Sequence, residues 1–277
     1  MGKVAINPLE VLLWNGRHSG RDIINIYSKF SPMMQLGANT KMLNFGLWKN
    51  SVTLPEAQKE MSQYISDFGQ FESAENVLDV GSGYCIPAAI WKSMFCNLDV
   101  FCMDLNFFEL KNGKNPELAQ INCSSTTIPF ANGCFDRVIA LESAQHFVPL
   151  EKFFLESRRV LRDSGKLVIA IPIIKESSIF KLGILGITWL SKKYTRGRIN
   201  KAISKAGLVV KREESVGGLV YEPFTRYYVQ NRDMFRERLV SAYSENIERL
   251  VFKSMQKMQQ LSSNGTIDYL LLNLEKS

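Results

Sequence analysis

Several features that define common protein classes are scarce in this 277-residue chain. It has two histidines and five cysteines, and no two cysteines form a C-x-x-C pair, so we expect no metal site. An odd number of cysteines without a pairing pattern suits a reducing compartment. The apolar run at residues 11–14 is too short for a signal peptide and follows an acid, Glu10. These shortages predict a cytoplasmic protein without a metal.

Concentrated positive charge is also missing, although the formal net charge is +7. Lysines and arginines are scattered, with short clusters only at 191–193 and 196–198. A nucleic-acid-binding face would gather its basic residues and interleave them with aromatics, so we expect no nucleic-acid partner. The plain interpretation is a solvated basic surface, and the alternative is contact with an anionic substrate or a membrane surface.

The most informative feature that is present is a buried strand running into a glycine turn. Residues 76–80 are mostly apolar, and Gly81 and Gly83 follow them. Glycine allows a sharp turn and lets a ligand approach the backbone. The next apolar run, 98–103, ends at Asp104, whose carboxylate can accept both hydroxyls of a ribose. This pattern is typical of the nucleoside-binding half of an open α/β sheet, where ligands lie outside the carboxyl ends of the strands.

The details of the turn indicate which nucleoside it suits. The dinucleotide fingerprint needs a third glycine where this chain has Ile86, which disfavours a pyrophosphate. Asp79, two residues before Gly81, suits a ligand with a cationic amino-acid end. Residues 76–85 resemble motif I (h-h-D-h-G-x-G) of the class I S-adenosylmethionine (SAM) methyltransferases, with Cys85 in place of the family's last glycine.

Two further blocks carry the same resemblance. Residues 128–147 resemble the "LPF…sFD…ES…HF" signature of small-molecule methyltransferases, and residues 158–169 resemble the family's "RVL+PGG.LVI" passage. Because order and spacing both match, the chain is identified as a member of the class I SAM-dependent methyltransferases of small-molecule type. The resemblance is to methyltransferase type 11 and to sterol, sugar and polyketide methyltransferases. It implies S-adenosyl-L-methionine as the cofactor.

The resemblance also implies which residues bind the cofactor. Asp79 and the two glycines would meet the amino-acid end of SAM, and Asp104 would meet the ribose. The full implied set is Asp79, Gly81, Gly83, Asp104, Leu105, Asn106, Ser124 and Leu141. The family's usual acid at the adenine is missing, and Ser124 offers only a weaker contact there. Cys85 and Ser124 therefore open the prospect of a reduced SAM affinity.

Catalysis needs little more than orientation, because the sulfonium of SAM is a good leaving group. A hydroxyl acceptor also benefits from a base. His146, after the fourth strand, is the first candidate for that base, and the alternative is that it only orders or packs the site. Glu142 is the second catalytic candidate, as a base or as a polar group of the cofactor or acceptor site.

The acceptor site is expected in the segments around the core. Residues 42–48 resemble the "hNhGhW" stretch found in front of the core of sterol, sugar and polyketide methyltransferases. The candidate acceptor-binding residues are Tyr27, Trp48, Trp189, Tyr221 and Phe224. Packing is the competing explanation for each of them. The apolar run 178–190 is too short to span a bilayer, so it could be a lid wall, a homodimer interface or a membrane-surface contact.

These patterns predict an α/β fold with a Rossmann-like, seven-stranded, mostly parallel sheet and an antiparallel last strand. The expected strands lie near 76–80, 98–103, 118–123, 135–141, 166–172, 208–212 and 268–274. We expect a helix from Arg21 to Phe30 that stops at Ser31-Pro32, and another after Pro55. The expected domains are a helical N-terminal cap (1–70) and a SAM-binding core (71–277) with substrate-lid insertions near 173–200 and 217–260.

Three functions are consistent with this sequence. The first is methyl transfer from SAM to a hydroxyl of a hydrophobic small molecule, namely a secondary metabolite, a glycoside or a lipid. The second is C-methylation of an isoprenoid, sterol-like or quinone precursor. The third is a SAM-fold protein that binds a partner without catalysis.

Overall fold

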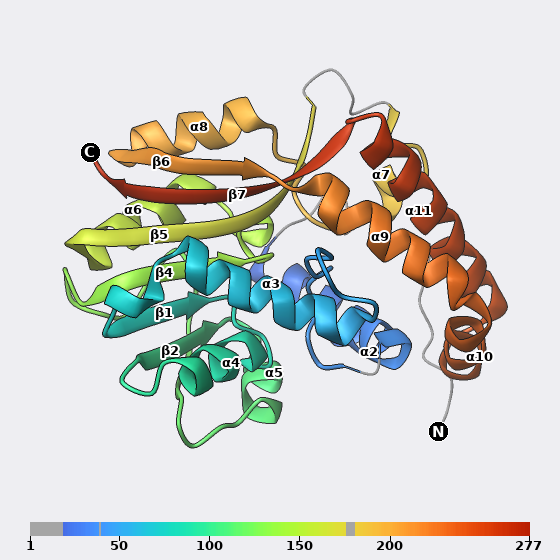
Figure 1. Cartoon of the computed structure of the whole chain (residues 1–277), viewed down its shortest axis with the longest axis horizontal. Helices are drawn as coiled ribbons and strands as arrows, with labels where there is room; N and C mark the ends of the chain where they lie inside the picture. Colours follow the sequence, from blue (N-terminus) through green and yellow to red (C-terminus); the bar gives the residue numbers. More distant parts are fainter. Residues whose placement is uncertain (1–18, 39, 176–180) are drawn as a thin grey trace. The chain divides into compact units, whose positions relative to one another are not determined.

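The computed structural model describes residues 19–38, 40–175 and 181–277, and its centre is a seven-stranded sheet (Figure 1). The strand order across the sheet is β3-β2-β1-β4-β5-β7-β6. The strands are β1 (Asn76–Val80), β2 (Asp99–Asp104), β3 (Ala119–Asn122), β4 (Phe135–Leu141), β5 (Leu161–Ile174), β6 (Leu208–Ser215) and β7 (Ile267–Lys276). Every strand predicted from the sequence is confirmed, and β5 begins earlier than expected, directly where the preceding helix ends.

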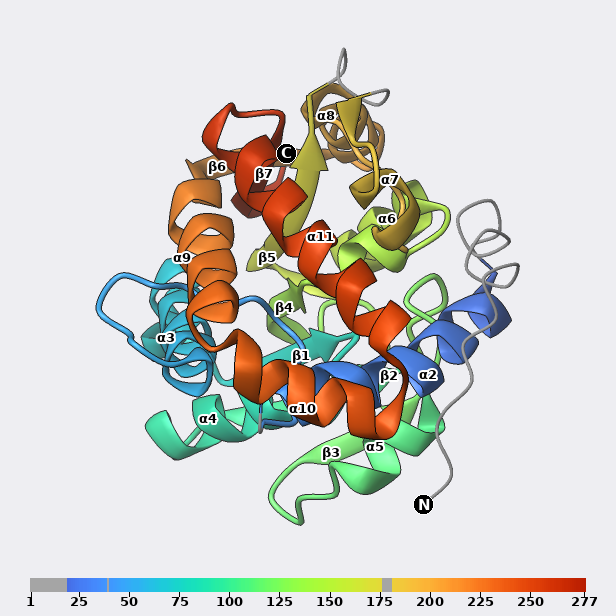
Figure 2. The same cartoon turned by 90° about the vertical axis from the view of Figure 1, so that its right-hand side faces the viewer.

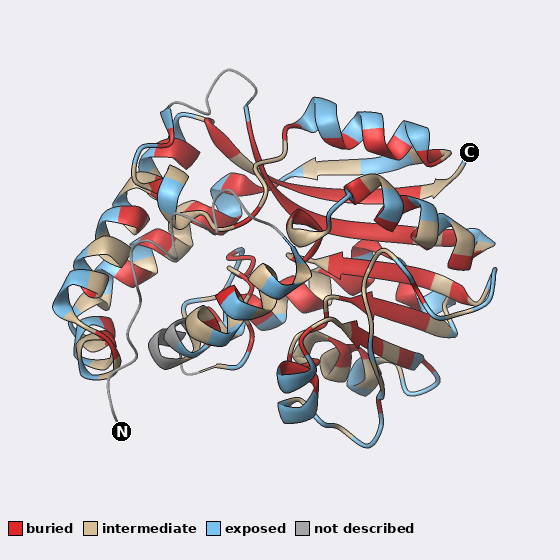
Figure 3. Cartoon of the chain, turned by 180° about the vertical axis from the view of Figure 1, so that it is seen from behind, coloured by how far each residue is buried: buried red, intermediate tan, exposed pale blue. Residues whose placement is uncertain are grey.

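The interior strand β1 is covered by neighbouring strands on both sides. It pairs in parallel with β2 on one side and with β4 on the other, so Val77 lies opposite both Val100 and Arg137. A strand with neighbours on both sides and helices on both faces needs an almost continuous apolar run. Figure 3 shows the central strands buried along most of their length.

The last strand runs in the opposite direction, as predicted. β7 pairs antiparallel with β6, with Leu208 opposite Lys276 and Ser215 opposite Leu270. In Figure 1, β7 also points against the parallel strands. The first residues of β7 therefore lie at the edge of the sheet where the parallel strands end.

Helices occupy most of the connections. They are α2 (Gly20–Ala38), α3 (Leu54–Phe68), α4 (Ile86–Met94), α5 (Phe107–Asn112), α6 (Leu150–Val160), α7 (Leu185–Thr188), α8 (Arg196–Lys205), α9 (Gly217–Gln230), α10 (Arg232–Ala242) and α11 (Glu245–Ser263), with short 3-10 turns η1 (Phe71–Ser73) and η2 (Ala144–His146). The predicted helix after Pro55 is confirmed as α3, with that proline in its first turn.

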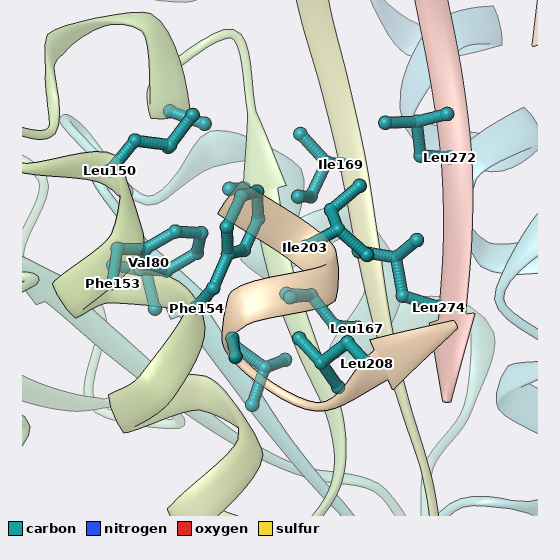
Figure 4. Close-up of a cluster of buried hydrophobic side chains, with 14 of the residues drawn as sticks. Val80, Leu150, Phe153, Phe154, Leu167, Ile169, Ile203, Leu208, Leu272 and Leu274 are labelled. Carbon is teal, nitrogen blue, oxygen red and sulfur yellow. The ribbon is translucent and has the colours of Figure 1, made fainter. Parts of the chain in front are cut away.

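One large apolar cluster joins α6 and α8 to the sheet (Figure 4). Phe153 and Phe154 of α6 and Ile203 of α8 are buried against strand residues that include Ile169 and Leu272. Burying side chains of this size stabilises the fold by about 1.5–3 kcal/mol each. This packing fixes the strands, and with them the position of their carboxyl ends.

The predicted end of the helix at Ser31-Pro32 was wrong. α2 continues to Ala38 and contains Pro32. A proline inside a helix removes one backbone hydrogen bond and disfavours the helix by about 3 kcal/mol. Tertiary packing opposes that penalty, because Ser31 is buried and α2 packs on α10.

The described residues fall into two compact units. The sheet unit consists of 61–173, 194–215 and 269–277, and the helical unit takes its residues from 1–60, 174–193 and 216–268. Within the helical unit, α11 packs on α9 and α10, and α10 packs on α2 (Figure 2). The second half of α3 belongs to the sheet unit, although it was expected in the N-terminal cap.

The apolar run 178–190 is only partly described, since residues 178–180 lie outside the described part. Its described portion includes the single helical turn of α7. Among the helices of the described residues, none combines the length and the apolar character needed to cross a membrane.

Candidate cofactor and catalytic site

Three loops of the sheet unit leave neighbouring strands at the same edge. They follow β1 (81–85), β2 (105–106) and β4 (142–146). β1 lies between β2 and β4, so parallel pairing brings the three loops together at the carboxyl ends of the strands. The site residues predicted in these loops are therefore brought together.

Gly81 packs the first loop against the third. Its φ of +76° suits glycine, and a Cβ there would lie 2.4 Å from the Cβ of Ser143. Ser143 in turn donates a hydrogen bond from its hydroxyl to the carbonyl of Val80 at 2.6 Å. The sequence did not indicate Ser143, because only the pairing of β1 with β4 brings it to the glycine turn.

Cys85 adopts the backbone conformation that explains the family's glycine at this position. Its φ is +57°, in the left-handed region that costs a residue with a side chain about 1–2 kcal/mol. The side chain is buried, and its sulfur lies 3.2 Å from Nε2 of Gln120. A hydrogen bond with Cys102 lowers the pKa of the Cys85 thiol to about 7. The side chain therefore lies against β2 and β3.

Asp104 ties the first loop to the second. Its Oδ2 accepts a hydrogen bond from the backbone N–H of Gly83 at 2.8 Å, and its Oδ1 accepts one from Asn106 at 2.7 Å. Burial raises the pKa of this carboxyl, and the backbone N–H groups of Asn106, Gly83 and Leu105 oppose that rise. Each carboxylate oxygen keeps acceptor capacity for a further donor, which a ribose diol can supply.

Asp79 is a buried carboxyl at the end of β1. Burial raises its pKa well above the usual range, and the nearby Cys85 and Asp104 raise it further. Among the described residues, none makes an ion pair or a side-chain hydrogen bond with Asp79. A ligand cation would favour the ionised form of this carboxyl.

Asn106 caps the amino end of α5, and the donor of its side-chain amide is buried. Its Oδ1 accepts a hydrogen bond from Phe108 N at 3.2 Å, which caps the helix. Its Nδ2 is buried and has no hydrogen-bond partner in the described part of the chain. Such donors are normally satisfied, so the atom is expected to meet a ligand or a water. Together with Asp79, it fits a ligand with a cation at one end and a nucleoside at the other, as SAM has.

Ser124 and Leu105 lie beside this region and already have local contacts. The hydroxyl of Ser124 is 2.9 Å from that of Thr126, within a turn. The carbonyl of Leu105 accepts a hydrogen bond from Nδ2 of Asn122 at 2.9 Å. These contacts fix the backbone of the second loop and of the segment after β3.

The third loop holds both catalytic candidates. Glu142 directly follows β4, whose last residue, Leu141, lies opposite Ala170 of β5. Glu142 has a φ of +51°, and its backbone N–H donates to the carbonyl of Ala170 at 2.9 Å. His146 ends η2, with its backbone N–H donating to the carbonyl of Ser143 at 2.9 Å. The predicted position of His146 after the fourth strand is confirmed.

Two side chains that the sequence did not indicate hold Glu142. The hydroxyl of Tyr269 donates to its Oε1 at 2.8 Å, and Nε2 of Gln145 donates to its carbonyl at 2.5 Å. Gln145 keeps a buried Oε1 with no hydrogen-bond partner among the described residues. The third loop thus has a fixed carboxylate and an acceptor available to a ligand.

Three of the predicted acceptor-binding residues share one aromatic cluster of the helical unit. The ring of Phe45 lies 5.6 Å from that of Tyr221 and 5.1 Å from that of Phe224, and Trp189 lies 6.4 Å from Tyr221. Phe45 belongs to the stretch 42–48, whose resemblance pointed to this region. Tyr221 is fully buried, so packing accounts for much of its role.

The other two acceptor candidates also belong to that unit. Trp48 adjoins the aromatic cluster, because its Nε1 donates to the carbonyl of Phe45 at 3.0 Å and Phe224 packs against its apolar neighbours. Trp48 packs on Tyr227 with ring centroids 5.2 Å apart. Tyr27 packs with Phe30 and Leu190 around the buried Ile26.

The described residues contain no group of three histidine, cysteine, aspartate or glutamate side chains placed to hold a metal ion. The polar groups of the site are the carboxyls, amides and hydroxyls named above, together with the backbone of the glycine turn.

Comparison with known proteins agrees with this geometry. Residues 78–169, from β1 into β5, match the family model of a methyltransferase domain, Methyltransf_11. The chain is 25% identical over 264 residues to erythromycin 3''-O-methyltransferase of Saccharopolyspora erythraea, covering 86% of this chain and 83% of that protein. It is 24% identical over 147 residues to sterol 24-C-methyltransferase of Pneumocystis carinii, covering 50% of this chain and 38% of that protein.

A solved structure shares the fold along nearly the whole chain. The cyclopropane synthase MmaA2 of Mycobacterium tuberculosis aligns with a TM-score of 0.79 and 15% identity, covering 93% of this chain and 98% of that one. The matched domain and the named relatives support a SAM-dependent methyltransferase, and the fold and the buried groups at the ends of β1, β2 and β4 agree with it.

Proposed function

We propose that this enzyme transfers the methyl group of SAM to a hydroxyl of a hydrophobic small molecule, namely a secondary metabolite, a glycoside or a lipid. The observation that carries the proposal is the similarity over 86% of the chain to an enzyme named for O-methylation. Similarity on this scale includes segments outside the matched domain, where an acceptor is expected to be recognised.

The chain's own residues have separate tasks in this proposal. Asp79 and the glycine turn would hold the cationic amino-acid end of SAM, and Asp104 would hold the ribose. Bound SAM supplies a methyl group on a sulfonium, so the protein has to place the acceptor oxygen in line with it. His146 or Glu142 would remove the proton of the hydroxyl. Phe45, Trp189 and Phe224 would contact the apolar part of the acceptor.

C-methylation is the second candidate function. It is favoured by the similarity to sterol 24-C-methyltransferase over half of the chain and by the carboxylate of Glu142 in the third loop. A carboxylate and aromatic faces both stabilise positive charge, which develops when a carbon–carbon double bond accepts a methyl group.

The position of the new methyl group distinguishes the two functions. The purified enzyme would be incubated with SAM carrying a deuterated methyl group and with matched panels of glycosylated alcohols, long-chain alcohols, isoprenoid diphosphates and sterols. We expect a labelled product whose methyl group resonates as an ether in NMR. A label attached to carbon would support C-methylation instead. SAM binding without any labelled product from these panels would favour the non-catalytic partner role.

Removing the buried carboxyl of Asp79 is expected to raise the stability of the fold and to lower its affinity for SAM. Its pKa is raised in the folded chain, so folding without cofactor disfavours the ionised form. Asp79→Asn is therefore expected to increase the free energy of unfolding at neutral pH, by on the order of 1 kcal/mol. The same change should weaken SAM binding about tenfold or more, because a charge-assisted contact is lost.

The pH dependence follows from the same raised pKa. SAM binding favours the ionised Asp79 and should release a proton, so SAM affinity is expected to rise as pH rises through the raised pKa. Urea unfolding and isothermal titration in buffers of different ionisation enthalpy would measure both effects. Asp99→Asn, at an exposed position of β2, is the matched control. An unchanged SAM affinity in Asp79→Asn would contradict this role.

A further inference from the structure

Tyr269 lies near the carboxyl ends of the parallel strands because β7 runs antiparallel to them. It is the third residue of β7 and precedes Leu270, which lies opposite Ser215 at the end of β6. The parallel strands β4 and β5 end at this same edge, and β5 lies between β4 and β7. A side chain from the last strand of the chain can thus meet the loop that follows β4.

The contact between Tyr269 and Glu142 is a hydrogen bond of ordinary length. The phenol hydroxyl donates to Oε1 of Glu142 at 2.8 Å, across 127 residues of sequence. Tyr269 is fully buried and Glu142 is half-buried, so the donor is fixed while its acceptor remains partly accessible. Hydrogen bonds to charged groups are among the stronger ones in proteins.

The backbone of Glu142 shows that its position is maintained at a cost. Its φ of +51° lies in the left-handed region, which a glutamate seldom adopts. The N–H bond to Ala170 and the bond from Gln145 to its carbonyl hold this conformation. Such conformations persist where surrounding contacts over-determine them, and they gather at functional sites.

We propose that Tyr269 is a positioning residue, which fixes the carboxylate of Glu142 in the third loop. Tyr269 acts through Glu142 and need not touch the acceptor. A phenol donor also favours the ionised form of a carboxyl over its protonated form. The inference rests on the proposed function for its catalytic meaning, whereas the effect on the carboxylate does not depend on the acceptor.

The test compares two tyrosine–glutamate pairs of the sheet unit. In Tyr269→Phe the ring stays and the donor is lost. The matched control is Tyr64→Phe, since Tyr64 on α3 donates to Oε2 of Glu214 on β6 at 2.6 Å. In Tyr269→Phe the ¹³C titration midpoint of the Glu142 side-chain carboxyl should move to higher pH in the cofactor-free chain. In Tyr64→Phe this midpoint should stay in place.

Turnover provides the second readout once an acceptor is known. We expect Tyr269→Phe to lower kcat about 10- to 100-fold, with KM for SAM changed less than about twofold, because one hydrogen bond to a charged group is lost. In a Glu142→Gln background the same change should have little further effect. A normal titration midpoint in Tyr269→Phe would overturn the inference, whereas a shifted midpoint without turnover on any alcohol would refute only the proposed O-methylation.

A folding defect of Tyr269→Phe would not end the test. The wild-type chain labelled with ¹³Cζ-tyrosine should show one tyrosine signal that titrates together with Glu142, and this response should vanish in Glu142→Gln. A labelled wild-type chain in which every tyrosine signal ignores the Glu142 titration would also overturn the inference.

Discussion

Replacing His146 by alanine is expected to lower kcat about 10²- to 10⁴-fold, which is the usual contribution of a general base. SAM affinity should change little, because most of the groups expected to bind SAM belong to β1, β2 and the loops that follow them, whereas His146 belongs to the loop after β4. Single-turnover kinetics with a saturating alcohol and isothermal titration with SAM would measure the two quantities separately.

The comparison with Glu142→Gln decides which group is the base. If His146 removes the proton from a hydroxyl, His146→Ala should lose more activity than Glu142→Gln. The reverse order would assign the base role to the carboxylate of Glu142. His18→Ala, which removes the other histidine of the sequence, controls for a general effect of losing a histidine. Unchanged kcat in His146→Ala would reduce His146 to a packing residue.

The fold was largely predictable because its core strands are locally encoded. Phe135–Leu141 was predicted residue for residue, since an apolar run between a turn and a polar loop has few alternatives in a parallel sheet. Pro32 misled the analysis because a local rule about proline competes with tertiary packing, which here keeps α2 continuous.

The site was predictable only where its residues lie in one motif. Asp79 and Asp104 lie in β1 and β2, and Gly81 follows β1, and the pairing of these strands is implied by the motif itself. Ser143 and Tyr269 complete the site through contacts across strands, and no local pattern marks a tyrosine near the end of the chain as a donor to Glu142. Such contacts depend on strand order and direction, which become visible only in the folded sheet.

Cys85 departs from the family's motif I. The sequence located this departure but did not explain it. Motif I marked it as a replacement for glycine, and its positive φ gives the reason for that glycine. The direction of its side chain, toward Gln120 and Cys102, follows from the register of β2 and β3. A motif has no information on that register.

Asp104→Ala is expected to abolish micromolar SAM binding, with a loss of about 10²- to 10⁴-fold in affinity. The variant would lose the two hydrogen bonds between the carboxylate and the ribose. Each such bond to a charged group contributes about 1.5–3 kcal/mol. The variant also removes the acceptor of Gly83 N and Asn106 N, so the first loop loses its tie to the second. Isothermal titration with SAM and S-adenosylhomocysteine would measure the loss.

A matched aspartate separates ligand binding from loop structure. Asp136 also accepts two backbone N–H groups, from Glu75 and Asn76 at 3.0 and 2.9 Å, but it lies at the amino end of β4, opposite the site. Burial raises its pKa, and those N–H groups together with Arg162 outweigh burial and lower it. Its folded pKa is therefore below the unfolded value, so Asp136 stabilises the fold at neutral pH, and this stabilisation is lost as pH falls through the folded pKa.

The two variants should therefore fail in different ways. Asp136→Ala is expected to lower the free energy of unfolding by about 1–3 kcal/mol while SAM affinity is retained. Asp104→Ala should lose SAM affinity with a smaller loss of stability, because burial raises the pKa of Asp104 and offsets part of what its hydrogen bonds contribute. Asp104→Asn, which keeps one acceptor oxygen, should lie between wild type and alanine in affinity. Equal SAM affinity in wild type and Asp104→Ala would place the ribose elsewhere. A change in loop structure could not compensate for the loss of a carboxylate that binds the ribose.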